Sequence, residues 1–152
     1  VRSKVLRRAI SDFKGEPLLN SPTTASSDTS SDYEDFRKKY PANYRCMDGH
    51  YVRSRAEAMV DNWLYTNGIA HAYERKLPIE EDVYSDFYIK SGNVYIEFWG
   101  MESDEKYAKR KAIKQQIYSA NEFNLIELND DDLNHIDDIL PRKLLAFGIT
   151  VN

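Results

Sequence analysis

The chain of 152 residues has little of what disulfide-bonded, zinc-finger and membrane proteins require. Its single cysteine, Cys46, excludes an internal disulfide and also excludes Cys₂His₂ and Cys₄ zinc sites. A lone thiol is typical of a reducing compartment, so we expect a cytoplasmic protein. No run of about 18 apolar residues is present, and we therefore expect no membrane span or membrane partner. Residues 1–10 are basic but lack the apolar stretch of a secretory leader.

The sequence also lacks the strong positive charge of a protein that coats nucleic acid passively. It has 21 Lys and Arg residues against 25 Asp and Glu residues, a formal net charge of −4. This balance disfavours simple electrostatic binding to nucleic acid. It does not exclude a nuclease, because a nuclease builds its metal site from acidic side chains. Phosphate loops of the GxxxxGK(S/T) and GxGxxG types are absent.

Composition divides the chain into a tail, residues 1–40, and a domain, residues 41–152. Residues 21–32 are almost entirely Ser, Thr and Asp, and they cannot bury enough apolar surface to offset the entropy of ordering them. We expect a flexible N-terminal tail or linker there, with a helical turn or two over residues 34–40 that ends before Pro41. The chain starts with Val rather than Met, so attachment to a larger upstream protein stays open.

Hydrophobic periodicity predicts the element order α-β-β-β-α-β-α, an α/β fold. Ser54 is the expected N-cap of the first helix, and Glu57 is its capping-box partner. We expect residues Ile113, Ile117 and Ala120 to form the buried stripe of the long second helix. The predicted elements are a helix over 53–67, ended by Asn67-Gly68; strands over 70–77, 84–89 and 94–99; a helix over 104–120; a strand over 123–128; and a last helix from 130, interrupted by Pro141 and ended by Gly148.

The second and third strands carry the candidate chemistry. If Ser91-Gly92 forms a two-residue turn, then Ile89 pairs with Val94, and Asp86 comes to lie opposite Glu97. Such opposed residues are about 4.5–5.5 Å apart at Cβ, and two carboxylates this close need a positive charge between them. Oxygen ligands favour Mg²⁺ or Mn²⁺. The alternative is a register shifted by two residues, with one acid at a solvated sheet edge.

A basic helix follows these strands. One face of this helix combines Tyr107 and Tyr118 with Lys111 and Lys114, and such a face beside two acids suits a bound phosphodiester. A merely solvated basic helix is the alternative. Glu57 could reach the same site, or could serve only the helix cap. The basic residues of the helix are Lys106, Lys109, Arg110, Lys111 and Lys114.

These motifs together resemble the PD-(D/E)XK nuclease superfamily, the fold of restriction endonucleases, over residues 44–152. Ser85-Asp86 stands where the family has Pro-Asp, and Glu97 stands where it has the (D/E) residue. Trp99 replaces the motif lysine, as in branches whose lysine has moved to the following helix. Residues 48–57 resemble the opening helix of that branch, whose Glu joins the active site. The resemblance implies a restriction-endonuclease-like core with a central mixed four-stranded sheet flanked by helices.

The resemblance implies a Mg²⁺-dependent deoxyribonuclease acting in repair, restriction or mobile-element biology. Asp86, Glu97 and the backbone carbonyl of Phe98 would hold Mg²⁺ or Mn²⁺. Lys114 is the first choice for the migrated lysine, Lys111 is the second, and Glu57 assists. The expected partner is DNA, or RNA, and a homodimer stays open. A catalytically inactive nucleic-acid-binding or protein-interaction module on the same fold is the alternative. The residues expected to contact nucleic acid are Arg53, Arg55, Lys109 and Arg110.

Two other kinds of site are disfavoured by the sequence. His50, His71 and His135 lie on separate elements without metal-ligand spacing, which argues against a histidine-based metal site. No histidine is evidently paired with Cys46, so this residue is interpreted as a small packed side chain rather than a nucleophile.

Overall fold

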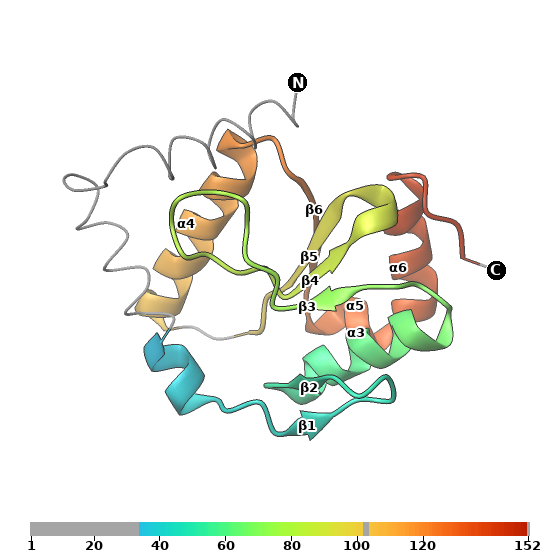
Figure 1. Cartoon of the computed structure of the whole chain (residues 1–152), viewed down its shortest axis with the longest axis horizontal. Helices are drawn as coiled ribbons and strands as arrows, with labels where there is room; N and C mark the ends of the chain where they lie inside the picture. Colours follow the sequence, from blue (N-terminus) through green and yellow to red (C-terminus); the bar gives the residue numbers. More distant parts are fainter. Residues whose placement is uncertain (1–33, 102–103, 152) are drawn as a thin grey trace. The chain divides into compact units, whose positions relative to one another are not determined.

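The computed structural model describes residues 34–101 and 104–151 (Figure 1). The proposed linker, residues 21–32, lies outside the described residues. Residues 34–39 are helical, as predicted. Two units are distinguished, and residues 76–84 belong with residues 1–41 rather than with the rest of the chain. Within 76–84, Lys76 forms a bridge with Tyr84, and the Leu77 N–H donates to the Val83 carbonyl at 2.8 Å. In the described part of the chain, no helix combines the length and apolarity needed to cross a membrane.

The main unit, residues 42–75 and 85–152, holds the sheets and the labelled helices, and its described part ends at Val151. The predicted α-β-β-β-α-β-α order is present, preceded by a small hairpin and with the last helix split in two. A 3₁₀ turn, Lys90–Gly92, joins β4 to β5. In chain order the elements are β1 Tyr44–Arg45, β2 Tyr51–Val52, α3 Arg55–Thr66, β3 Ala72–Tyr73, β4 Phe87–Ile89, β5 Val94–Phe98, α4 Glu105–Ala120, β6 Asn124–Leu128, α5 Asp130–Asn134 and α6 Ile136–Leu145.

The central sheet is mixed and four-stranded, in the order β3-β4-β5-β6. The pairs β3–β4 and β4–β5 are antiparallel, and β5–β6 is parallel, with α4 as the connection between the two parallel strands. A parallel pair needs such a crossover, because a tight turn cannot return the chain to the same end of the sheet. The predicted α/β architecture with a mixed sheet of four strands is therefore confirmed.

The two faces of the sheet differ, as the alternation of β4 and β5 predicts. One face is apolar and packs against α3, α5 and α6; the other carries Tyr95 and Glu97 and faces α4 (Figure 1). The apolar core includes Phe87, Ile89, Val94, Ile96, Ile126 and Leu128 from the sheet, and Val60, Trp63, Leu64, Leu133, Leu140 and Leu144 from the helices.

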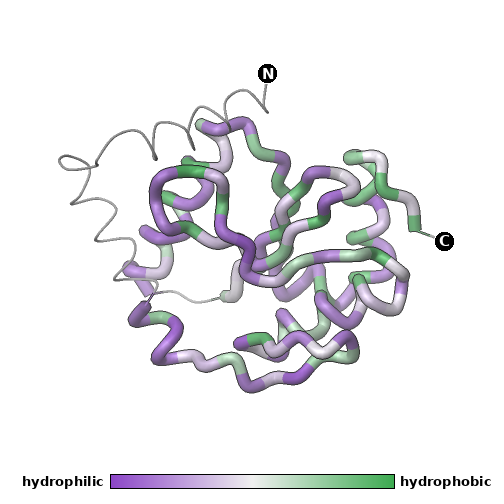
Figure 2. Tube along the Cα trace, viewed as in Figure 1, coloured by the Kyte–Doolittle hydropathy of each residue, from purple (hydrophilic) through white to green (hydrophobic). Residues whose placement is uncertain are grey.

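The predicted buried stripe of α4 is wrong. Ile113 and Ala120 are exposed, while Tyr118 is buried and Lys114 is turned toward the sheet. Hydrophilic residues occupy much of this helix, as the purple stretches of Figure 2 show. The face of α4 that meets the sheet is chosen by the buried acid on β5, which needs hydrogen-bond donors, rather than by the isoleucines.

Two predicted elements differ clearly from their expected bounds in the structure. The strand predicted over 70–77 is only two residues long, because Glu74 has a positive φ of 52° that ends the extended run. The last helix breaks at His135 rather than at Pro141, which lies inside α6. Burial of Leu140 and Leu144 outweighs the one hydrogen bond that this proline removes. Gly148 ends the segment with a φ of 79°, as predicted.

Candidate active site

The β4–β5 hairpin has the predicted register. Phe87 lies opposite Ile96, Tyr88 opposite Tyr95, and Ile89 opposite Val94. The next residues outward are Asp86 and Glu97. The Asp86 Oδ2 atom accepts a hydrogen bond from the Phe98 N–H at 2.8 Å, which holds the aspartate across the hairpin beside Glu97. The turn that fixes this register has Asn93 in the left-handed conformation, with a φ of 47°.

Glu97 is the centre of a buried polar group. Its side chain is 1% exposed. Lys114 Nζ donates to Oε1 at 2.9 Å, and the Tyr118 hydroxyl donates to Oε2 at 2.6 Å. Lys114, the first choice from the sequence, therefore contacts the acid. Lys111 Nζ instead lies 5.4 Å from the centre of the Trp99 ring.

Glu57 joins the same group from α3. The Arg53 N–H and the Tyr73 hydroxyl each donate to its Oε1 atom at 3.0 Å, and its carboxyl group is close enough to Asp86 for the two charges to interact. Ser54 is the N-cap as predicted, because its Oγ accepts from the Glu57 N–H at 3.1 Å. The reciprocal half of the capping box is absent from these contacts, since the Glu57 carboxylate accepts from Arg53 rather than from Ser54. Its carboxylate is thereby available to the site.

Burial and mutual repulsion make the three carboxyl groups hard to ionise. Burial, followed by the charge of Asp86, raises the pKa of Glu57 to about 8 and that of Glu97 to about 7. Burial also raises the pKa of Asp86, although Lys114 and the Phe98 N–H oppose this effect. For Lys114, burial alone would lower the pKa, but the charges of Glu97 and Asp86 outweigh it and raise the pKa.

The donor set of this group fits Mg²⁺. Glu57, Asp86 and Glu97 carry three negative charges when ionised, and Lys114 supplies one positive charge, so an excess of two negative charges is left for a divalent ion to balance. All the candidate metal ligands are oxygen atoms, which Mg²⁺ prefers. A protein-bound Mg²⁺ ion usually takes only one or two carboxylates. The Phe98 carbonyl follows Glu97 directly on β5. An ionised carboxylate has about four lone-pair sites, so Glu97 can bind an ion and keep both donors.

The predicted nucleic-acid contacts lie in different surroundings. The Arg53 guanidinium forms an ion pair with Glu74, and its side chain is only 7% exposed. It is therefore poorly accessible to a nucleic acid. Arg55 and Lys109 are exposed, and Arg110 is half-buried. Of this set, Arg55 and Lys109 are thus the most accessible to a phosphate backbone.

Two of the histidines lie close together although their spacing along the chain does not predict it. The rings of His50 and His71 lie 5.3 Å apart and form a group with Asp48 and Asp61. Among the described residues, this is the group of three or more His, Cys, Asp or Glu residues whose ligand atoms all lie within 4.8 Å of one another. The spacing of residues along the chain misses this group, because its members come from three separate segments: the β1–β2 loop, α3 and the residue before β3. Asp61, an acid in the apolar stripe of α3, was the available signal.

Comparison with known proteins finds a distant, partial match. Over 92 residues the chain is 35% identical to the uncharacterized protein MJ1519 of Methanocaldococcus jannaschii; the match covers 58% of this chain and 8% of that protein. The chain thus spans a small part of its relative's length. No family model matches the chain, and no solved structure matches it.

Proposed function

We propose that this chain is a Mg²⁺-dependent nuclease that hydrolyses DNA phosphodiester bonds on a restriction-endonuclease-like core of the PD-(D/E)XK type. One observation carries the proposal: Asp86 and Glu97 are held side by side on neighbouring strands, and Lys114 of the following helix lies 2.9 Å from Glu97. These are the acid, acid and migrated lysine that the resemblance implies. The mixed sheet, with helices on both faces, is consistent with such a core.

The residues of the site have distinct roles in this proposal. Asp86, Glu97 and the Phe98 carbonyl would hold Mg²⁺, which when bound supplies a water of lowered pKa and neutralises phosphate charge. Lys114 remains protonated and places an ammonium group where negative charge develops on the phosphate. The Phe98 N–H and the Tyr118 hydroxyl fix the orientation of the two carboxylates. Glu57 adds a third carboxyl group beside Asp86 and assists the two metal-binding acids.

The substrate side of the proposal rests on α4 and the start of α3. Lys111 lies beside the Trp99 ring, and Lys109 and Arg55 are exposed. We propose DNA as the substrate, in repair, restriction or mobile-element biology, with RNA as the substrate to be compared. Contacts with the phosphate backbone would make binding steeply dependent on salt.

The test is cleavage of duplex, single-stranded and branched DNA, and of RNA, with Mg²⁺, with Mn²⁺ and with EDTA. We expect cleavage of DNA that depends on Mg²⁺ or Mn²⁺. The variant Glu97→Gln should lose at least about a hundredfold in rate while keeping most of its DNA affinity. Glu127→Gln is the matched control, because Glu127 occupies the same register on β6 and bonds Trp99 and Gln115 instead.

A second candidate function has its own supporting observation. Both Glu97 oxygens already accept hydrogen bonds from the protein, which is also what a purely structural buried ion pair would show. A catalytically inactive binding module would bind DNA without cutting it under every metal condition. Cleavage equal in the wild type and in Glu97→Gln would also contradict the nuclease proposal.

A further inference from the structure

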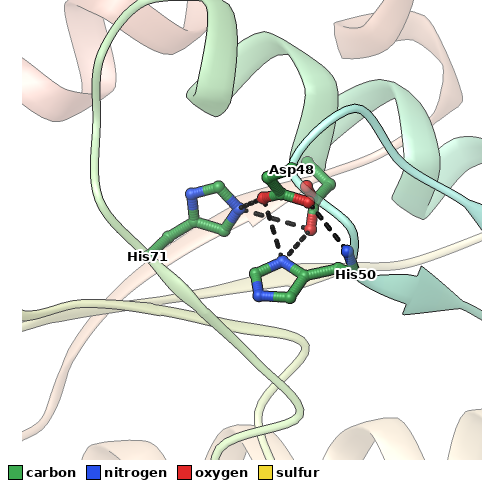
Figure 3. A group of neighbouring side chains, drawn as sticks. Asp48, His50 and His71 are labelled. Atoms are coloured by element: carbon green, nitrogen blue, oxygen red, sulfur yellow. Dashed lines mark hydrogen bonds and ion pairs between the residues drawn. The ribbon is translucent and has the colours of Figure 1, made fainter.

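The second polar cluster uses none of the proposed nuclease residues, although Asp61 lies one turn after Glu57 on the same face of α3. Asp48 and His50 are in the loop between β1 and β2, Asp61 is on α3, and His71 directly precedes β3. The loop is tight: the Gly49 N–H donates to the Cys46 carbonyl at 3.0 Å, and Gly49 has a φ of 93°. This turn brings Asp48 and His50 to the same side, where they meet His71 (Figure 3). Asp61 completes the group.

Four ligand atoms face a common point in this cluster. His50 Nδ1 lies 3.0 Å from Asp48 Oδ2 and 2.8 Å from Asp61 Oδ2. His71 Nε2 lies 3.1 Å and 3.2 Å from the same two oxygens. In tetrahedral Zn²⁺ sites, with Zn–N and Zn–O bonds of about 2.0–2.2 Å, neighbouring ligand atoms are about 3.3–3.5 Å apart. A small outward shift of the side chains would therefore admit an ion.

The hydrogen bonding of His71 leaves its inward nitrogen without a partner. Its Nδ1 lies 2.9 Å from the Ile69 carbonyl, and since a carbonyl only accepts, Nδ1 carries the proton. In the neutral ring, Nε2 then presents a lone pair to two carboxylate oxygens. Although the His71 side chain is only 3% exposed, Nε2 has no hydrogen-bond partner among the described residues. Metal-binding histidines are typically oriented in this way, with the other ring N–H donated to a backbone carbonyl.

The charges of the cluster are also unbalanced. Asp61 is fully buried, and its Oδ1 atom has no hydrogen-bond partner in the described part of the chain. Together with Asp48 it brings two negative charges next to two imidazoles. Buried charges are costly unless they are paired or bind a metal. Two imidazolium ions would balance the charge, but the His71 Nε2 position does not give a proper hydrogen bond to either oxygen. One divalent cation balances the charge of the two carboxylates and gives His71 Nε2 a partner.

We propose that Asp48, His50, Asp61 and His71 bind one divalent transition-metal ion that ties the β1–β2 hairpin to α3 and β3. The mixed nitrogen and oxygen ligands favour Zn²⁺ over Mg²⁺ or Ca²⁺, which prefer oxygen alone. The backbone N–H of His50 donates to the Asp48 Oδ1 atom at 3.0 Å, and this bond orients the Asp48 carboxylate. The site is structural, because the ion joins three segments of the chain: the β1–β2 loop, α3 and the residue before β3.

Zinc titration of the metal-stripped protein tests this proposal. We expect the wild type to bind one equivalent of Zn²⁺ tightly by calorimetry, and Co²⁺ to give the visible absorption of tetrahedral coordination. His50→Ala and His71→Gln should weaken Zn²⁺ binding by at least about a hundredfold, more than the roughly 10–100-fold typical of outer-shell changes. His135→Ala, a change at an exposed histidine, should bind like the wild type.

The nuclease site provides an internal control. Glu97→Gln should keep the full equivalent of Zn²⁺, which separates this cluster from the proposed Mg²⁺ site. If the His71 variant does not fold, thermal denaturation of the wild type provides the test. Its Tm should be several degrees higher with one equivalent of Zn²⁺ than in EDTA. Absence of stoichiometric binding, a Tm unaffected by Zn²⁺, or equal binding by His50→Ala would each overturn the proposal.

Discussion

Lys114 is the residue on which both the proposed chemistry and the local stability of the site depend. It is the cation in contact with Glu97, and its side chain is about a quarter exposed. Replacing it with Met leaves a buried carboxylate without its cation. Removing one partner of a fully buried ion pair costs about 3–5 kcal/mol, and partial exposure reduces this to about 2–3 kcal/mol here.

We therefore predict that Lys114→Met abolishes cleavage and lowers the free energy of unfolding by about 2–3 kcal/mol, measured by urea denaturation. Lys111→Met is the matched control, because its ammonium lies over Trp99 and not on either acid. It should change stability by less than about 0.5 kcal/mol and reduce cleavage only modestly. If the two variants behave alike, Lys114 has no special role.

The raised pKa of Glu57 should make the free energy of unfolding of the metal-free protein depend on pH. Its carboxyl group has an ordinary pKa of 4.5, and burial and then Asp86 raise the pKa to about 8 in the folded state. Between these pH values the folded protein holds a proton that the unfolded chain has released. The stabilisation from this group is therefore complete below about pH 4.5 and is lost as the pH rises through about 8.

The variant Glu57→Gln removes this contribution while keeping a neutral side chain of similar shape. In EDTA, we predict that the wild-type free energy of unfolding falls relative to that of the variant by a few kcal/mol, in order of magnitude, between about pH 4.5 and 8. Chemical denaturation at several pH values measures it. Parallel pH profiles for the two proteins would show that Glu57 ionises freely.

At the scale of single elements, α3 positions both clusters. Its inward face carries Glu57, Val60, Asp61 and Leu64, so two acids lie on what the sequence pattern presents as an apolar stripe. The start of the helix is fixed by the Ser54 hydroxyl, which accepts from the Glu57 N–H. A loss of this cap frays the turn that holds Glu57 beside Asp86.

We predict that Ser54→Ala lowers the free energy of unfolding by about 1 kcal/mol, the usual cost of an N-cap deletion. Thermal or urea denaturation measures the loss. Ser119→Ala, at an exposed position near the end of α4, should be neutral within about 0.5 kcal/mol. A Ser54 variant as stable as the Ser119 variant would mean that the cap contributes nothing.

The elements also show how far the sequence could predict the fold. The β4–β5 register followed from the turn and the alternation of apolar residues, because a shift by one residue would turn the core face outward. The predicted burial of Ile113 and Ala120 on α4 was wrong, because the helix turns its Lys114 and Tyr118 face to the sheet, where both bond Glu97. The periodicity of apolar residues contains no information on such a buried polar contact.

At the scale of the whole molecule, the limit of sequence analysis is long-range convergence. Asp86 and Glu97 could be predicted because they are neighbours across a hairpin, and Lys114 was chosen on the following helix by the family resemblance. Asp48 and His71 are brought together by the packing of a hairpin loop against a helix and a strand, which no local spacing encodes.

The central claim is that Asp86 and Glu97 share a divalent ion next to Lys114. The most direct measurement is anomalous X-ray scattering from crystals soaked in Mn²⁺ after metal removal. We predict an anomalous peak within about 2.5 Å of an oxygen of each carboxylate, with Lys114 Nζ nearby. The peak should disappear in Glu97→Gln. No peak at this position, with Glu97 bonded only to Lys114 and Tyr118, would contradict the account.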